Sequence, residues 1–130
     1  MILSGGSNSS VNTAKKTVHK FEFEVGPQGK LVSKMVALPS MNQRRMKHCQ
    51  VILKGILFVF FGHQDTMSLY SDTLEYLDLE DPDASFKEIK IQNYGKPYVV
   101  EPMVFVEPCT SDSIRFFGGQ VKDNRREDFS

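Results

Sequence analysis

The chain has 130 residues, enough for one domain with a hydrophobic core, and its 40% hydrophobic and 25% charged residues are typical of a globular protein. Its 16 basic and 16 acidic residues cancel, so no net field attracts it to nucleic acid or to an anionic membrane. The longest apolar stretch, 51–61, is interrupted by Lys54 and Gly55 and is too short to span a bilayer as a helix. Composition and charge therefore argue against a nucleic-acid-binding protein and a helical membrane protein.

The cysteines and the first residues predict a cytoplasmic protein. Cys49 and Cys109 lie far apart and match no zinc-binding or redox spacing, so we expect two unpaired thiols in a reducing compartment, with one disulfide as the alternative. Segment 1–3 is followed at once by Ser4, Gly5 and Gly6, which is not the pattern of a signal peptide.

Apolar runs that end in glycine occur three times along the chain, at 2–6, 58–62 and 114–119. Their last glycines lie 56 and 57 residues apart (62 − 6 = 56; 119 − 62 = 57). Segment 17–24 aligns with segment 73–80 at the same 56-residue offset. Because two separate landmarks agree, we predict a repeat protein with a period of about 56 residues.

The central copy divides into four short strands. Strands are predicted at 48–53 and 56–61, joined by a hairpin turn at Lys54-Gly55, and the second is apolar enough for burial on both faces. After a polar loop at 62–72, an alternating strand runs over 73–79. Pro82 and its flanking aspartates predict a turn before a last strand at 86–91.

The alternating strand at 73–79 has Leu74, Tyr76 or Leu77, and Leu79 as its inward candidates. In the third copy, a strand at 103–107 is joined to the next by a looser loop at 108–112. No helix is predicted. Four antiparallel strands per repeat indicate an all-β fold built from propeller-type blades.

The central copy resembles a kelch repeat. The resemblance rests on segment 38–42 ahead of the blade, Arg45 three residues before His48, the run 58–62, Tyr76 in the third strand, and Phe86 where the family usually has tryptophan. The chain departs from the pattern at Phe61, which replaces one glycine of the usual pair, and it has no tryptophan.

The resemblance covers nearly the whole chain and implies a fragment of a kelch β-propeller, with about two blades. Residues 1–38 are expected to end one blade, 39–96 to form a complete blade, and 97–130 to begin the next. A propeller typically needs 4–8 blades, and an isolated pair leaves open sheet edges, so a longer protein is expected.

The resemblance also implies structural roles for the signature residues. The glycines are expected where inner strands of neighbouring blades converge, because a Cβ would intrude there; they are Gly5, Gly6, Gly62, Gly118 and Gly119. In the family an arginine-to-aromatic arrangement buttresses neighbouring blades. Arg45 is therefore expected to be structural, and His48 to be a packed core residue with its hydrogen bonds satisfied.

No motif predicts an enzyme. The histidines, His19, His48 and His63, are not spaced as metal ligands, and nucleophile-elbow, P-loop and dinucleotide motifs are absent. The turn at Pro82 explains the nearby aspartates without a calcium ion. The enzymatic alternative, a galactose-oxidase-like copper site, needs paired tyrosines and histidines that cannot be placed here. We predict no cofactor, no metal and no small-molecule substrate.

Binding through loops is the function that the sequence favours. The connections at 62–72 and 92–101 are the candidates, and their proposed contact residues are His63, Gln64, Asp65, Tyr94 and Tyr98. The alternative for the tyrosines is that they only pack their loop onto the blade. We expect a non-enzymatic scaffold for other proteins within a multi-subunit assembly, such as a cytoskeletal or ciliary one. The alternative is a kelch-type substrate adaptor of a ubiquitin ligase.

Overall fold

The computed structural model describes residues 1–8, 11–64, 71, 73–91, 98–100, 103–106, 114–117 and 120–122. For residues 8 and 11–13, and beyond 91 for all except Ile114, only the backbone is described. Within these ranges the chain is all-β and antiparallel, which confirms the predicted fold class. The only helical element there is a single 3-10 turn, Pro27–Gly29.

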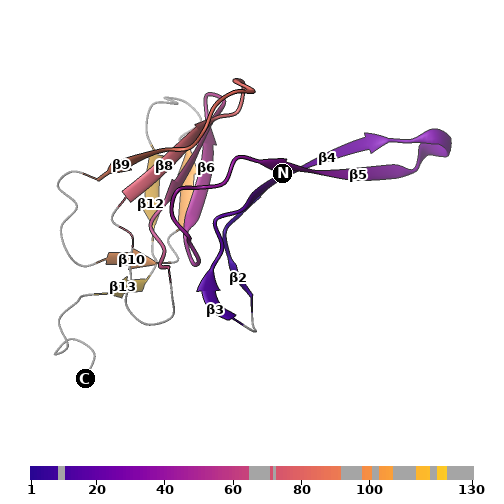
Figure 1. The fold of residues 1–130 in the computed structure, drawn as a ribbon. Coiled ribbons are helices and arrows are strands. Elements are labelled where there is room, and N and C mark those ends of the chain that lie inside the picture. The colour runs from indigo at the N-terminus through magenta and orange to yellow at the C-terminus, as the bar shows by residue number, and fades with distance from the viewer. Residues whose placement is uncertain are drawn as a thin grey trace.

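Two sheets make up the body of the molecule (Figure 1). The first sheet has the order β1-β4-β5, with β1 at Ile2–Ser4, β4 at Val18–Val25 and β5 at Leu31–Leu38. The second has the order β6-β7-β8-β9, with β6 at Cys49–Leu53, β7 at Ile56–Phe60, β8 at Thr73–Asp78 and β9 at Lys87–Lys90. The four strands predicted for the central copy are therefore present within one or two residues.

Three further antiparallel pairs complete the strands of the described ranges. They are β2 (Ser7–Asn8) with β3 (Val11–Ala14), β10 (Tyr98–Val100) with β13 (Gln120–Lys122), and β11 (Met103–Val106) with β12 (Ile114–Phe117). The last pair matches the hairpin predicted for the third copy.

Local sequence explains the two turns of the second sheet. Lys54 and Gly55 both have positive φ, 51° and 76°, as a two-residue turn matched to the twist of a hairpin requires. At the second turn, the N–H of Asp83 donates to Asp81 Oδ1 at 2.9 Å, and the N–H of Ala84 donates to the Asp81 carbonyl at 3.2 Å. The predicted turn around Pro82 is thus closed by the chain itself.

The 56-residue repeat reappears in the strand registers. Ile2 pairs with Lys20 in the first sheet, and Phe58 pairs with Tyr76 in the second, both shifted by 56 positions. The backbone repeats as well, because Gly5 and Phe61 both have φ of 60°, and Gly6 and Gly62 have φ of 89° and 83°. The sequence repeat is therefore a repeat of structure.

The second sheet has two apolar faces, which we call face A and face B. Directly paired residues share a face, so face A carries Leu57, Val59 and Leu77. Face B carries Phe58, Phe60 and Leu74. Shifted by 56 residues, face A of the first sheet holds Leu3 and Phe21, and its face B holds Ile2 and Val18.

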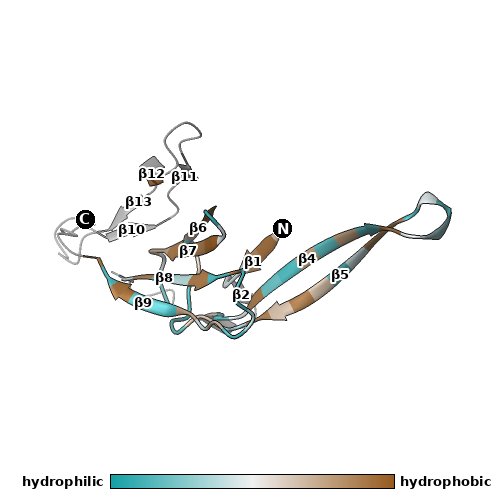
Figure 2. Cartoon of the chain, turned by 90° about the horizontal axis from the view of Figure 1, so that it is seen from above, coloured by the Kyte–Doolittle hydropathy of each residue, from teal (hydrophilic) through white to brown (hydrophobic). Residues whose placement is uncertain are grey.

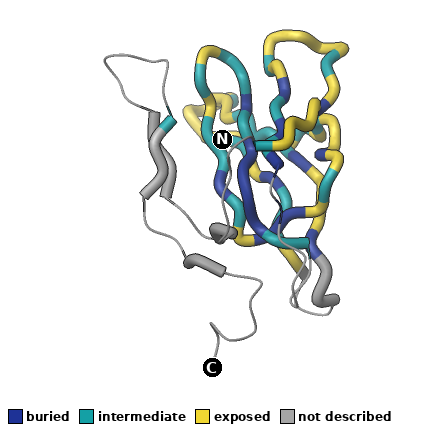
Figure 3. Tube along the Cα trace, turned by 90° about the vertical axis from the view of Figure 1, so that its left-hand side faces the viewer, coloured by how far each residue is buried: buried dark blue, intermediate teal, exposed yellow. Residues whose placement is uncertain are grey.

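The sheets stack so that face B of one lies on face A of the next. Val18 on face B of the first sheet is buried in one cluster with Leu57, Val59 and Leu77, together with Met41 and Phe86. Ile114 of β12 packs against the cluster around Phe60 on face B of the second sheet. Buried segments, dark blue in Figure 3, lie along these strands, while turns at the ends of the body are exposed.

The prediction of which side chains of β8 point into the core is partly wrong. Its fully buried residues are Thr73, Glu75 and Leu77, whereas Leu74 and Tyr76 are only half-buried on the other face. Hydrophobicity alone mispredicted the phase because the more deeply buried face of this strand carries two polar side chains.

Candidate functional site

Arg45 is completely buried, with 0% of its surface exposed. Its Nε donates to Glu75 Oε2 at 3.1 Å, and its Nη2 donates to Thr73 Oγ1 at 2.8 Å. Its Nη1 lies within 3.0 Å of the Phe61 carbonyl, the Thr73 carbonyl and Ser71 Oγ. Burial lowers the pKa of Arg45, and the neighbouring Glu75 carboxylate opposes that shift.

Glu75, also 0% exposed, completes this network. One carboxylate oxygen accepts the N–H of Asn42, and the other accepts the N–H of Gln43 at 3.2 Å in addition to Arg45. The pair therefore fastens segment 42–45, which enters the second sheet, to strand β8. The expected aromatic partner of Arg45 is a carboxylate instead, because a buried guanidinium needs a counter-charge and a filled set of acceptors.

Sequence reasoning missed Glu75 because it was assigned to the solvent-facing phase of an amphipathic strand. One signal was present: Thr73, Glu75 and Leu77 share one parity of the strand, so burial of Leu77 commits the other two to the same face. Once Glu75 is expected to be buried, Arg45, which precedes the blade, is the expected partner for its carboxylate.

Gly5 and Gly62 both lie against segment 45–48, at the junction where the end of β1 meets the entry to the second sheet. A Cβ on Gly5 would lie 2.3 Å from the Arg45 carbonyl oxygen, and one on Gly62 would lie 2.6 Å from the Met46 carbonyl oxygen. The side chain of His48 lies against both positions. Gly6 has open space around its Cα, so its positive φ is the constraint there. Gly118 and Gly119 lie outside the described residues.

His48 is packed at this junction. Its Nε2 lies 2.8 Å from Ser4 Oγ, while Nδ1 is buried without a hydrogen-bond partner among the described residues. Burial, followed by the nearby Arg45 charge, lowers the pKa of His48 to about 4. The prediction of a fully satisfied histidine therefore holds for one ring nitrogen of the two in the described structure.

The two aromatic signature residues lie on different sides of the second sheet. Phe86 is buried in the cluster between the sheets. Tyr76 is half-buried on face B, where its ring centroid lies 6.2 Å from that of Phe58.

The loop residues proposed for binding are only partly described. His63 forms a backbone bridge to Met46, with N–O distances of 2.9 and 3.0 Å in the two directions. Gln64 accepts the N–H of Ala14 through its carbonyl and donates its side-chain amide to Gln43 Oε1 at 3.2 Å. Asp65, Tyr94 and the side chain of Tyr98 lie outside the described residues. The described start of the 62–72 loop is therefore fastened to the body.

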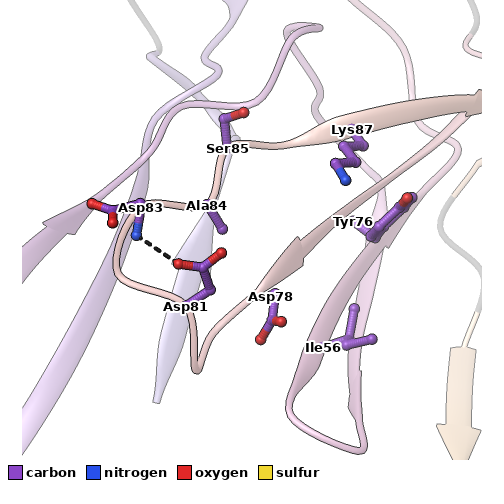
Figure 4. Close-up of a pocket in the computed structure, with 8 residues that line it drawn as sticks. All are labelled: Ile56, Tyr76, Asp78, Asp81, Asp83, Ala84, Ser85 and Lys87. Atoms are coloured by element: carbon purple, nitrogen blue, oxygen red, sulfur yellow. Dashed lines mark hydrogen bonds between the residues drawn. The ribbon is translucent and has the colours of Figure 1, made fainter.

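A cavity of about 340 Å³ opens beside the turn at Pro82 (Figure 4). Its lining combines carboxylates with one cation and apolar side chains; it comprises Ile56, Tyr76, Asp78, Asp81, Asp83, Ala84, Ser85 and Lys87. Asp78 and Asp81 each accept a backbone N–H two residues ahead, which explains their positions as turn residues. Among the described residues, no cluster of three metal-ligating side chains occurs.

The hairpin β4–β5 extends well beyond the rest of the first sheet as a two-stranded arm (Figure 1). Its strands pair over eight positions, against four for the corresponding pair β8–β9. Apolar and polar residues alternate along β4, whereas β5 is mainly apolar, as Figure 2 shows. Large hydrophobic side chains are exposed here, including Val25 at 75% and Leu31 at 69%. Such exposure is typical of an interaction surface.

Comparison with known proteins identifies no family for the chain. No protein-family model matches the chain, and a search of curated proteins finds no match. In the described part of the chain, no helix is long and apolar enough to cross a membrane.

Proposed function

We propose that this chain contributes kelch-type blades to a β-propeller that acts as a non-enzymatic scaffold for protein–protein interaction. The observation that supports it best is the repeated stacking of face B on face A. Val18 on face B of the first sheet packs on Leu57 and Val59 on face A of the second sheet. Ile114, one period after Leu57, packs on face B of the second sheet. Sheets stacked in this repeated sense are the architecture of propeller blades.

The interior of the molecule supports a structural role over catalysis. Arg45 and Glu75 are fully buried and directed at each other and at backbone groups, so neither is exposed to a substrate. The Cys49 thiol is free and buried, and burial raises its pKa to about 12, far from the value of a reactive thiolate. A free thiol also supports the proposed cytoplasmic location.

Face A of the first sheet supports assembly into something larger. Leu3 is 57% exposed there, although its equivalent in the second sheet, Val59, is completely buried by the preceding sheet. An apolar face that is covered in one repeat and uncovered in another fits a scaffold with a further layer. We propose that the scaffold is a structural subunit of a multi-protein assembly, such as a cytoskeletal or ciliary one.

The coding sequence on both sides of this chain tests the proposal. We expect further repeats of about 56 residues, each with an apolar strand that ends in glycine, and their number gives the blade count. Flanking sequence without such repeats contradicts the propeller. An upstream BTB and BACK pair would instead select the ubiquitin-ligase adaptor.

A second test uses the purified 130-residue chain. We expect a broad melting transition, because part of its apolar sheet surface is uncovered. A sharp cooperative melt of a monomeric chain contradicts an incomplete propeller.

A further inference from the structure

The arm formed by β4 and β5 has one mainly apolar face and one face on which charged and apolar side chains mix. Paired residues share a face, so Phe21, Phe23 and Val25 lie with Met35, Ser33 and Leu31 on the apolar side. The opposite side carries Lys20, Glu22, Glu24 and Lys34 together with Val32 and Val36, and Lys20 and Glu22 form an ion pair at 2.7 Å. The apolar face is continuous with Leu3 on β1, and exposed fractions of 54% for Phe23 and 60% for Met35 show that the described chain leaves it uncovered.

The stacking of blades does not account for the whole arm. By the 56-residue shift, Phe21 and Phe23 correspond to Leu77 and Leu79, which belong to the cluster between the sheets. Val25 corresponds to Asp81, which already lies in the turn between β8 and β9. The distal arm therefore reaches past the surface that a stacked blade covers in this chain.

The outer strand of the arm has an open hydrogen-bonding edge. Within the described part of the chain, β5 is the last strand of its sheet and pairs only with β4. Its eight residues hold one register without a bulge, and they contain no proline. Lys34 is the one charge on this strand. Edges of this length are usually shortened, bulged or covered, so an uncovered one can accept another strand.

The direction of the edge groups follows from the register. Phe21 donates its N–H to the Met1 carbonyl at 2.8 Å, hence away from β5. In an antiparallel ladder the partner of such a residue also turns its N–H and C=O outward, and the pattern repeats every second residue. Phe21 pairs with Met35, so Leu31, Ser33, Met35 and Ala37 present their backbone groups to the open edge.

We propose that the open edge of β5 binds an extended segment of a partner protein by strand addition. The segment alternates apolar residues with polar ones and carries an acidic residue at the position beside Lys34. Its apolar side chains lie next to Leu31 and Met35 on the apolar face, and its carboxylate lies beside Lys34 on the opposite face. This partner class deepens the proposed scaffold function, on which it rests.

Charge favours such a segment over a second copy of the chain. Strand β5 has the sequence LVSKMVAL and contains no acidic residue, so a second β5 offers Lys34 no carboxylate. In one two-fold register it places Lys34 opposite its own counterpart, and like charges directly opposite each other destabilise a sheet. Glu22 lies directly opposite Lys34 on β4 but forms its ion pair with Lys20, so the outer side of Lys34 is where a further carboxylate can bind.

Binding of a synthetic peptide tests the proposal. The probe is a fluorescein-labelled peptide in which valine alternates with threonine and glutamate replaces the central threonine; fluorescence anisotropy with the 130-residue chain measures its affinity. Ser33→Pro removes an outward N–H without removing a bond to β4, and we expect it to weaken binding about tenfold. The matched control Ser33→Ala keeps that N–H and is expected to bind within about twofold of wild type.

A charge exchange tests the acidic position. Lys34→Glu is expected to weaken binding of the glutamate peptide about threefold and to strengthen binding of a peptide with lysine at its centre, in line with cross-strand charge pairs. Circular dichroism of each variant checks that the β content is retained.

Three outcomes overturn the proposal: no binding by the wild-type chain, equal binding by Ser33→Pro, or self-association of the wild-type chain that Ser33→Pro abolishes. The last outcome assigns the edge to a second copy. If flanking repeats are found but the peptide does not bind, only the strand-addition proposal fails; missing repeats contradict the propeller independently of the peptide.

Discussion

Replacing Glu75 by glutamine tests whether the buried ion pair holds the second sheet together. The substitution keeps the size of the side chain but removes the only carboxylate that Arg45 contacts among the described residues. The glutamine amide must then direct one NH₂ group at a donor, because Asn42 N, Gln43 N and Arg45 Nε all donate to the two carboxylate oxygens.

The expected cost is large because both side chains are fully buried. Leaving one partner of a buried ion pair without its counter-charge costs about 3–5 kcal/mol. Arg45 keeps its bonds to the Phe61 carbonyl and to Thr73, so we expect the lower half of this range for Glu75→Gln.

Native-state hydrogen exchange provides the measurement. The opening free energy of the Leu57 and Val59 amides on β7 reports the second sheet even where global melting is not two-state. Glu88→Gln is the matched control, since this exposed glutamate on the neighbouring strand accepts from the Gln43 side chain and acts on Arg45 only through its charge among the described contacts. We expect it to change the opening free energy by less than about 1 kcal/mol.

The double variant Arg45→Met, Glu75→Leu separates the pair from its surroundings. Two apolar residues remove both charges, so its cost should be smaller than the sum of the two single changes to methionine and leucine. A loss below about 1 kcal/mol for Glu75→Gln, or additive costs in the double variant, refutes the assignment of Arg45 and Glu75 as a buried stabilising pair.

Three further predictions concern Gly62, His48 and Cys49, and they are tested by hydrogen exchange, by pH profiles of stability and by thiol alkylation. Gly62→Ala should destabilise the junction by at least about 1 kcal/mol more than Gly6→Ala, because both have positive φ but only the first adds a Cβ 2.6 Å from a carbonyl oxygen; equal costs would show that the close approach is unimportant. His48 has its pKa lowered to about 4 in the folded chain, so the unfolded state binds more protons between that value and about 6.5. Stability should therefore fall by up to about 3 kcal/mol as the pH is lowered through this window, and a comparison of pH profiles should show that His48→Asn lacks this component. Cys49, with its pKa raised to about 12, should resist iodoacetamide at pH ~8 in a Cys109→Ser background until denaturant is added; rapid alkylation of the folded chain would contradict its burial.

Much of the strand layout could be predicted from local sequence. Lys54-Gly55 predicts a tight hairpin because the turn needs two residues with positive φ, and Pro82 with its aspartates predicts the next turn. The glycine-ended runs predicted the repeat, because the tight backbone geometry at Gly6 and Gly62 recurs with the period of the fold. The kelch family and the scaffold function remain proposals.

The sequence by itself determined strands, turns and period, since each depends on residues that are neighbours along the chain. Only the tertiary structure decided which face of each strand is buried and with what. Glu75 lies inside because Arg45, thirty positions earlier, is buried opposite it. The apolar residues of the arm, Val25 and Leu31, lie outside because the described chain places no layer over them. A hydrophobic pattern shows which residues can be buried. Whether they are buried depends on which distant segment packs against them, and residues that are neighbours in the sequence do not show that.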